Sequence, residues 1–182
     1  MRYTGTPIDE RLVGYTDTNL VFQAHIEHVK PRSVCRRELE ARGGQYGREV
    51  CEDMDHRNLV AALEVKRNPP ARSEIFGAAA HGDEVIPVTP LQARCEERFQ
   101  FDDKGGIHGL DDLARETIRL LKLQHATLTA WRRGAITGFF PPELALTREE
   151  IEHLISRLDQ PVGGKLPEFS FCIRGYARSL LA

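Results

Sequence analysis

Prolines and glycines divide this 182-residue chain into short segments, which limits the length of the helices and strands it can form. Proline fixes φ, removes a backbone donor and pushes the preceding residue out of the helical region. Asn68-Pro69-Pro70 is therefore a firm break. Gly43-Gly44 is typical of a helix end, and Pro141-Pro142 precedes a further helix start. The elements of the chain are expected to lie between these breaks.

The first half of the chain predicts a hairpin followed by a short helix. Residues 11–29 contain two runs rich in β-branched and aromatic residues, separated by the polar triplet DTN, which is typical of a β-hairpin. Residues 34–42, with the sequence VCRRELEAR, predict a helix with Ser33 as its cap and with exposed arginines. These arginines are Arg36, Arg37 and Arg42.

The second half predicts two helices and a final strand. A stripe of residues at steps of three and four, Ala114, Ile118, Leu121, His125 and Leu128, predicts one long helix ending near residue 131. The capping box from Thr147 to Glu150 predicts the start of the next helix. Residues 84–101 predict an edge strand followed by a better paired strand. Alternating apolar residues in EFSFCIRGY, residues 168–176, predict a last strand.

Together these elements predict an α+β fold. We expect a mostly antiparallel sheet with the N-terminal hairpin, packed by two principal helices from the C-terminal half. The length and the apolar fraction of 41% are sufficient for one core, so residues 1–182 are expected to form a single domain.

The charge balance and the cysteines bear on partners and compartment. A net charge of −2 gives no long-range attraction for nucleic acid or an anionic membrane, so such contacts would be local. The apolar runs are far shorter than the roughly 20 residues that a bilayer requires, which predicts no membrane partner. The first residues lack a secretory pattern, and the four cysteines lie far apart. We therefore expect a cytoplasmic protein with reduced thiols.

Residues 49–67 can be interpreted as a helix or as strands, and the choice affects function. Glu64-Val65-Lys66, preceded by Asp53 and Asp55, resembles the PD-(D/E)xK signature of metal-dependent nucleases. The resemblance implies that the carboxylates hold Mg²⁺ or Mn²⁺ and that Lys66 assists the attacking water. Glu64 and Lys66 share a face only on a strand. The alternative is a charged helix whose alanines pack inward.

A zinc site built from His25, His28, Cys35 and Cys51 is a further alternative, because all four are zinc ligand types. The spacing opposes it, since residues three apart on a strand point to opposite faces. No GxSxG, Walker A or GxGxxG motif occurs in the chain. The leading interpretation therefore includes no metal and no cofactor.

Because no convincing catalytic set is present, the sequence favours a non-enzymatic binding or regulatory protein. The expected contacts are with a protein partner, and nucleic acid is a second class of partner. The expected surfaces are the helix arginines Arg36, Arg37 and Arg42, and the segment Trp131-Arg132-Arg133, where an aromatic side chain stands beside two cations. The divalent-metal nuclease using Asp53, Asp55, Glu64 and Lys66 is the alternative.

Overall fold

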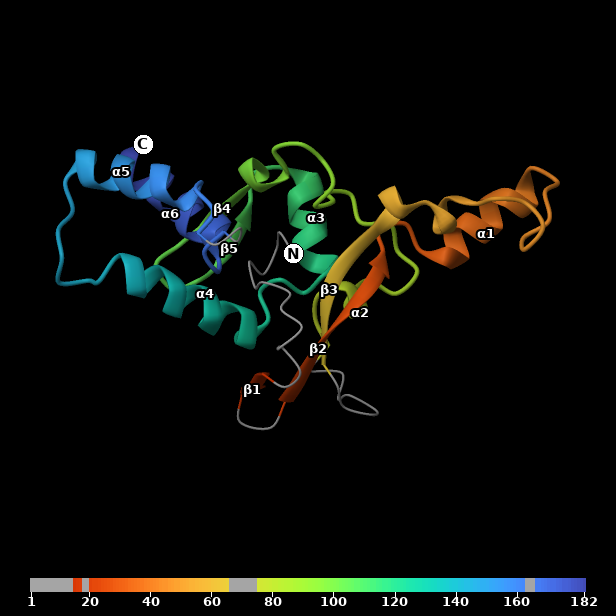
Figure 1. The fold of residues 1–182 in the computed structure, drawn as a ribbon, viewed down its shortest axis with the longest axis horizontal. Coiled ribbons are helices and arrows are strands. Elements are labelled where there is room, and N and C mark those ends of the chain that lie inside the picture. Colours follow the sequence, from red (N-terminus) through yellow and green to blue (C-terminus); the bar gives the residue numbers. More distant parts are fainter. Residues whose placement is uncertain (1–14, 18–19, 66–74, 163–165) are drawn as a thin grey trace.

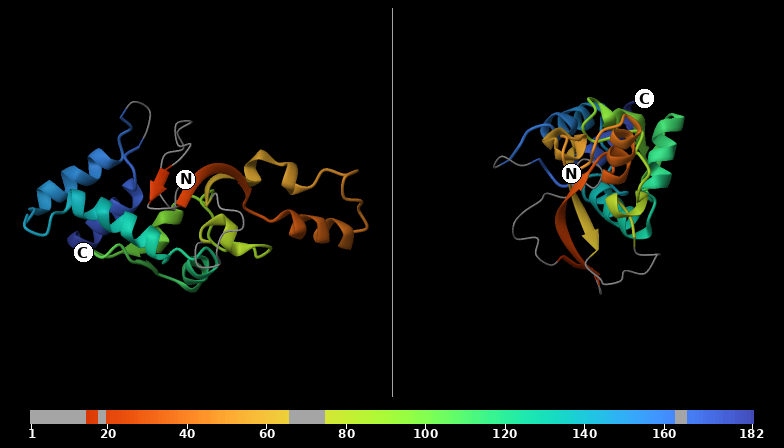
Figure 2. Two further views of the ribbon diagram at one scale, coloured as in Figure 1. Left: turned by 90° about the horizontal axis from the view of Figure 1, so that it is seen from below. Right: turned by 90° about the vertical axis from the view of Figure 1, so that its right-hand side faces the viewer.

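The computed structural model describes residues 15–17, 20–65, 75–162 and 166–182, and these form an α+β structure. The predicted α+β class is therefore confirmed. Figures 1 and 2 show an elongated arrangement, with α1 (Arg32–Ala41) at one end and the helices α4 (Ala126–Phe139), α5 (Arg148–Leu158) and α6 (Ser170–Leu181) at the other. None of the helices in the described ranges is both long enough and apolar enough to cross a bilayer.

The N-terminal sheet has three antiparallel strands in the order β1-β2-β3. β1 (Tyr15–Asp17) pairs with β2 (Leu20–His28), as the predicted hairpin requires, while residues 11–14 and 18–19 of that prediction, including most of its turn, lie outside the described residues. β3 (Leu59–Val65) pairs along β2, so this part of the ambiguous segment is a strand. Pairing with β2 favours the strand, because the backbone N–H and C=O groups of β3 find their hydrogen-bond partners in the neighbouring strand.

Between β2 and β3 the chain forms α1 and two single turns of 3₁₀ helix, η1 (Glu52–Met54) and η2 (His56–Asn58). Cys35, Leu39 and Cys51 form a small hydrophobic cluster here, separate from the main core. We call residues 32–58 the α1 arm. Ser33 does not cap α1, which begins at Arg32, and its hydroxyl instead donates to Asp83 at 2.6 Å.

The second sheet is a hairpin of β4 (Phe99–Phe101) and β5 (Ile107–Gly109). It confirms the predicted strand at the end of residues 84–101. The edge strand expected before it is wrong, since the chain there has no strand and then forms η4 (Cys95–Arg98). Pro87 and Pro90 lack the N–H groups that a β-ladder needs, which explains why no strand forms in this segment.

The predicted long helix is wrong, because the chain turns in the middle of the apolar stripe. α3 (Asp112–Leu120) ends before Lys122, whose φ of 47° is left-handed, and α4 then begins with His125 as its cap. The break lets Leu121, Leu123 and Leu128 all reach the core. The free energy gained by burying these leucines outweighs that of continuing one helix through the turn.

The predicted last strand is also wrong, because residues 170–181 form helix α6. Its buried residues Cys172, Ile173 and Ala177 are all 0% exposed, and they recur at helical spacing. Over so short a run, the apolar residues Phe169, Phe171 and Ile173 do not distinguish the two-residue period of a strand from the 3.6-residue period of a helix.

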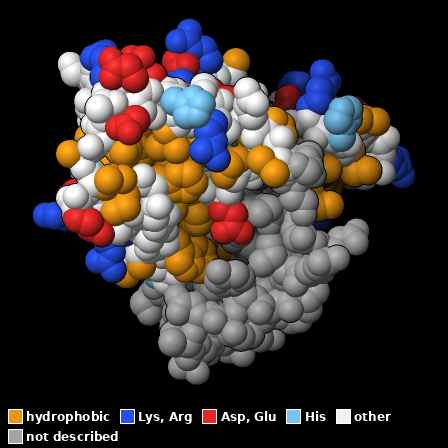
Figure 3. Space-filling view, turned by 60° about the vertical axis from the view of Figure 1, so that its left-hand side comes forward, with side chains coloured by type: hydrophobic (Ala, Val, Ile, Leu, Met, Phe, Trp, Pro, Cys, Tyr) orange, Lys and Arg blue, Asp and Glu red, His pale blue; other side chains and the backbone are white. Residues whose placement is uncertain are grey.

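The main core lies between the β4–β5 hairpin and the C-terminal helices rather than on the N-terminal sheet. Its most buried apolar side chains come from β4, β5, α3, α4, α5 and α6, and Arg132 lies among them. Figure 3 brings the end with α4, α5 and α6 forward and shows hydrophobic side chains gathered across that face, with charged side chains around them. α2 (Ala78–His81) packs against β3.

Candidate functional site: a basic pocket beside the second hairpin

A pocket of about 500 Å³ lies between β5, α3 and the turn that joins α3 to α4. Among the described residues, three cationic side chains, two histidines and one amide line it, and no carboxylate is part of that described lining. The residues are Ile107, His108, Gly109, Arg115, Ile118, Arg119, Lys122, Gln124 and His125. Its size falls within the range of pockets that bind small molecules. We call it the basic pocket.

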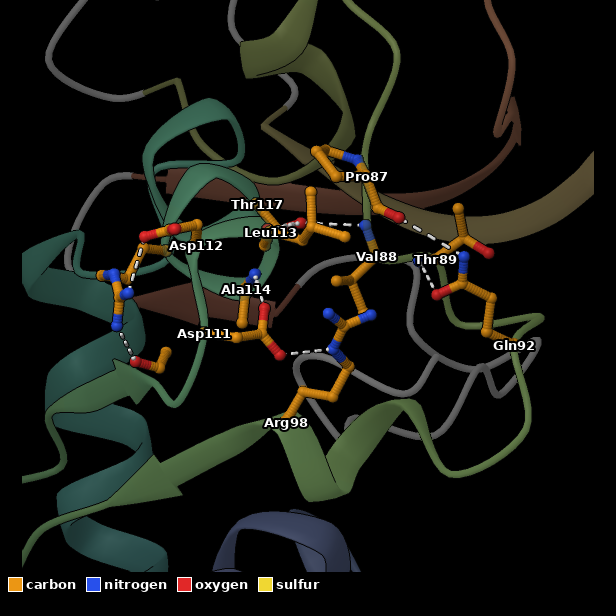
Figure 4. A network of polar contacts seen from close by, with 12 residues as sticks. Pro87, Val88, Thr89, Gln92, Arg98, Asp111, Asp112, Leu113, Ala114 and Thr117 are labelled. Atoms are coloured by element: carbon orange, nitrogen blue, oxygen red, sulfur yellow. Dashed lines mark hydrogen bonds and ion pairs between the residues drawn. The ribbon is translucent and has the colours of Figure 1, made fainter.

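Helix α3 supplies one wall of the basic pocket because its sequence places one set of side chains on one face. Ile118 and Arg119 follow Arg115 by three and four residues, so the three side chains share one face of the helix, and Lys122 joins the lining from the turn after it. Asp111 caps the helix by accepting the amide of Ala114 at 2.8 Å. Arg98 donates to the other oxygen of that carboxylate at 2.7 Å, which fixes α3 against the chain before β4 (Figure 4).

The opposite side of α3 is held by a buried hydroxyl. Thr117 is 0% exposed, and its Oγ1 accepts the amide of Val88 at 3.0 Å while it donates to the carbonyl of Leu113 at 2.9 Å (Figure 4). The two contacts satisfy both hydrogen-bonding roles of a buried hydroxyl. Helix α3 is therefore fixed on its inner face and leaves its arginines on the pocket side.

The turn between α3 and α4 forms the end of the basic pocket, and the buried Arg132 holds it in place. The Nε of Arg132 donates to the carbonyl of Gly105, and Nη2 donates to the carbonyl of Leu123, both at 2.7 Å. Gln124 adds a bond from its amide to the carbonyl of Ile107 at 3.1 Å. These bonds connect the β4–β5 turn to the α3–α4 turn, so both sides of the pocket have a fixed separation.

The arginines of the basic pocket also contact carboxylates outside its lining. Arg115 pairs with Asp112 at 2.6 Å, and Arg119 pairs with Glu116 at 2.6 Å. The hydrogen bonds from Arg119 lower the pKa of Glu116. Both pairs are exposed, so each contributes little to stability and leaves other guanidinium donors available to a ligand.

A carboxylate and a histidine form a pair at the mouth of the β4–β5 turn. Asp102 Oδ2 lies 2.8 Å from His108 Nε2, and Asp102 Oδ1 accepts the amides of Gly106 and Lys104 at 2.7 and 3.0 Å. Burial alone would raise the pKa of Asp102, but these three hydrogen bonds together lower it. Asp102 is therefore an ionised, fixed acceptor beside a histidine that lines the pocket.

Sequence reasoning did not identify the Asp102–His108 pair or the basic pocket. Asp102 and His108 are six residues apart in the sequence, and they meet because the hairpin folds back on itself. The available signal was the pair Gly105-Gly106 between two short apolar runs, which is typical of a tight hairpin turn. Gly105 has a φ of 80°, and a Cβ on it would lie 2.2 Å from the carbonyl oxygen of Thr129.

The predicted surface at residues 131–133 is wrong in part. Arg132 is 1% exposed and Trp131 is half-buried against the core, with its ring edge-on to Phe76 at 6.4 Å between centroids. Only Arg133 of the three is exposed. Residues Leu128, Arg132 and Ile136 recur every four residues, so helical phase buries Arg132 with the two apolar residues.

The predicted arginines at residues 36, 37 and 42 are all exposed at the α1 end of the molecule, whereas β5 and α3 of the basic pocket lie near its middle (Figure 1). Arg36 pairs with Glu40 at 2.8 Å and lies over the ring of Tyr46, while Arg42 donates to the carbonyl of Glu38. Acidic residues of the same helix therefore offset part of this positive charge. Arg37 is exposed on the same helix.

The structure does not gather the predicted nuclease residues. Asp53 is 5% exposed, and its carbonyl contacts His28, which stands opposite Leu59 at the start of β3. Glu64 stands five residues further along β3, about 17 Å away at roughly 3.3 Å per residue. Asp55 pairs with Arg57 at 2.7 Å. Lys66 lies outside the described residues.

The predicted zinc ligands meet only in part. Cys35 and Cys51 share the small cluster of the α1 arm, where burial and the neighbouring Cys51 raise the pKa of Cys35 to about 11. His28 contacts the carbonyl of Asp53, and the side chain of His25 lies outside the described residues. Among the described side chains, no three histidine, cysteine or acidic residues are close enough to hold a metal.

Comparison with known proteins gives no assignment. No protein-family model matches the sequence, and no curated protein matches it. The function of the chain therefore has to be inferred from the chemistry of its own residues.

Proposed function

We propose that this chain is a binding protein that takes a phosphate-bearing ligand, single-stranded nucleic acid, in its basic pocket. The observation that carries the proposal is the lining: Arg115, Arg119 and Lys122 converge there, and no carboxylate is among the described lining residues, although the whole chain has a net charge of −2. The carboxylates that pair with the two arginines, Asp112 and Glu116, lie outside that lining. A local group of cations in a slightly acidic chain favours one anionic contact over general attraction.

The chemistry of the lining favours phosphate over a simple carboxylate. Two guanidinium groups and an ammonium offer more donors than one carboxylate can accept, whereas a phosphate presents several oxygens. The pocket is concave, and this shape suits a flexible single strand whose phosphate can enter it. Reading a duplex would instead require an element that protrudes into a groove.

Binding of a fluorescein-labelled single-stranded 12-mer, followed by fluorescence anisotropy, tests the proposal. Replacing Arg115 and Arg119 together with Gln should weaken binding at least about tenfold, because two charge-assisted contacts are lost. Binding should also weaken with salt, with a slope of about −2 in log K against log salt for three phosphate contacts.

The matched control removes the same charge from the α1 end of the molecule, away from the basic pocket. The double variant Arg36→Gln with Arg42→Gln on α1 should bind as the wild type does. Equal weakening in both double variants would refute the assignment to the basic pocket and would indicate an effect of net charge. Loss of binding only in the α1 variant would move the site to the α1 arm.

A protein partner is the second candidate function, favoured by the hydrophobic face in Figure 3. Phe139, Leu144 and Leu180 are exposed on or beside its helices, and surfaces of this kind are enriched at protein contacts. We expect the variant with Leu144→Glu and Leu180→Glu to remain monomeric if the wild type self-associates through this face. Sedimentation velocity of both proteins across a concentration series tests this expectation.

A further inference from the structure

We propose that the basic pocket cleaves RNA, with the 2′-hydroxyl of the substrate as the nucleophile and His108 as the general base. This inference rests on the proposed function, because the phosphodiester must first occupy the pocket. It assigns a reaction to the Asp102–His108 pair, which simple binding of an anion would not require.

Asp102 prepares His108 for this role by fixing its tautomer. An ionised carboxylate only accepts hydrogen bonds, so in the neutral imidazole the 2.8 Å contact selects the tautomer with the proton on Nε2 and the lone pair on Nδ1. The carboxylate is held by the amides of Lys104 and Gly106. A base oriented by a third, fixed group is the arrangement that recurs in general-base catalysis.

Gly106 is fitted to this carboxylate. A Cβ on Gly106 would lie 2.3 Å from Asp102 Oδ2, the same oxygen that contacts His108. Any larger residue would displace the carboxylate or the turn. The turn therefore combines a residue without a side chain, a bound carboxylate and an oriented histidine within residues 102–108.

The composition of the lining limits the choice of nucleophile. The nine described residues of the lining include no hydroxyl, thiol or carboxylate. With His108 assigned as the base, we place the attacking group on the ligand. Among phosphate-bearing polymers, RNA carries a hydroxyl beside each phosphate, and the same hydroxyl is what distinguishes it from DNA.

The step balances without a further reactant. His108 Nδ1 takes the proton of the 2′-hydroxyl, the 2′-oxygen forms a bond to phosphorus, and the bond from phosphorus to the 5′-oxygen breaks. The leaving oxygen takes a proton from water, and His108 later returns its proton to solvent. The products are a 2′,3′-cyclic phosphate and a 5′-hydroxyl. Arg115, Arg119 and Lys122 stabilise the negative charge that accumulates on the phosphoryl oxygens.

A uridine 12-mer of RNA, incubated with the full chain in the presence of EDTA, tests the inference. We expect cleavage that yields cyclic phosphate ends, detected by mass spectrometry. The same oligomer with 2′-O-methyl groups throughout should bind and remain intact. His108→Ala should lower kcat about 100-fold or more and leave anisotropy binding within a few fold, because a general base contributes to the reaction step.

Two further variants separate chemistry from structure. Added imidazole should restore part of the activity of His108→Ala, which a folding defect would not allow. Asp102→Asn should lower kcat with little change in KM, because Asp102 is a positioning residue. The control His153→Ala changes an exposed histidine of α5 and should be fully active.

The outcomes distinguish this inference from the function on which it rests. RNA that binds in the basic pocket but is not cleaved overturns the inference and leaves the binding function standing. Equal cleavage by the wild type and His108→Ala, purified in parallel, also overturns it, because the activity would then come from elsewhere. If single-stranded DNA binds in the basic pocket but RNA does not, only the inference is overturned, and if neither binds, both proposals are overturned.

Discussion

At the scale of single residues, the buried Arg132 connects the fold to the candidate site. It is 1% exposed and donates to two carbonyls, one in each of the turns that border the basic pocket. Burial lowers the pKa of Arg132 to about 10, so the guanidinium is protonated at neutral pH. Its charge is solvated by carbonyl oxygens, and loss of the side chain would leave those acceptors unsatisfied.

Arg132→Met should therefore destabilise the protein by about 3 kcal/mol, because a similar stem remains while two buried carbonyls lose their donors. Urea unfolding measures the change in the free energy of unfolding. The neighbouring exposed Arg133 is the matched control, and Arg133→Met should change that free energy by less than about 0.5 kcal/mol. Equal effects in the two variants would show that the carbonyl contacts are not important.

The buried thiol of Cys172 predicts a loss of stability at alkaline pH. Burial raises the pKa of Cys172 to about 12 from an ordinary value of 9.0. Below pH 9 the thiol is protonated in both the folded and the unfolded states, so its contribution to stability is fully present. Between pH 9 and about 12 the unfolded state loses the proton first, and stability falls by up to about 1.4 kcal/mol per pH unit.

Urea unfolding of wild type and Cys172→Ala at pH 8, 9 and 10 measures this contribution. The free energy of unfolding of the variant should fall less steeply over this range, whatever its value at pH 8. Parallel slopes for the two proteins would show that Cys172 does not contribute to the alkaline instability.

At the scale of elements, the two predicted helix caps had different outcomes: Ser33 does not cap α1, whereas the capping box that starts α5 is confirmed. The capping box predicted at Thr147 is present. The Thr147 hydroxyl accepts a hydrogen bond from the amide of Glu150, and the Glu150 carboxylate accepts one from the amide of Thr147. Apolar periodicity was less dependable. It predicted one helix where α3 and α4 are separate, and a strand where α6 forms, because burial in the assembled core selected between two compatible patterns.

Thr147→Ala should lower the free energy of unfolding by about 1 kcal/mol, since the first turn of α5 loses a side-chain acceptor. Thermal unfolding followed by circular dichroism measures the change. Thr137→Ala, at an exposed position inside α4, is the control and should have little effect because alanine is the better helix former. A Thr147 variant as stable as the control would show that the box is dispensable.

At the scale of the whole molecule, the hydrophobic residues form two separate clusters. The main core joins the β4–β5 hairpin to the C-terminal helices, whereas Cys35, Leu39 and Cys51 form the small cluster of the α1 arm. The basic pocket belongs to the part with the main core. A small cluster offers little apolar burial, so we expect the α1 arm to open at lower free energy than the core.

Leu39→Ala should therefore raise amide hydrogen exchange within residues 32–58 and leave the main thermal transition almost unchanged. Leu128→Ala, in the main core at 1% exposure, should lower the global stability by about 3 kcal/mol. Hydrogen exchange mass spectrometry and calorimetry on both variants provide the comparison. A large drop in the main transition of Leu39→Ala would instead support the predicted single domain, in which the two clusters unfold together.

The sequence by itself determined what depends on neighbouring residues: the hairpin before residue 29, the helix near residues 34–42, the break at Pro141-Pro142 and the Thr147 capping box. The break predicted at Asn68-Pro69-Pro70 lies outside the described residues. Only the tertiary structure decided which of two adjacent arginines is buried, and where the apolar stripe of residues 114–128 is interrupted. It also decided that Asp102, His108 and the cations of α3 converge on one pocket. The physical reason is that burial and charge convergence depend on contacts between elements, which the spacing of residues within one element does not specify.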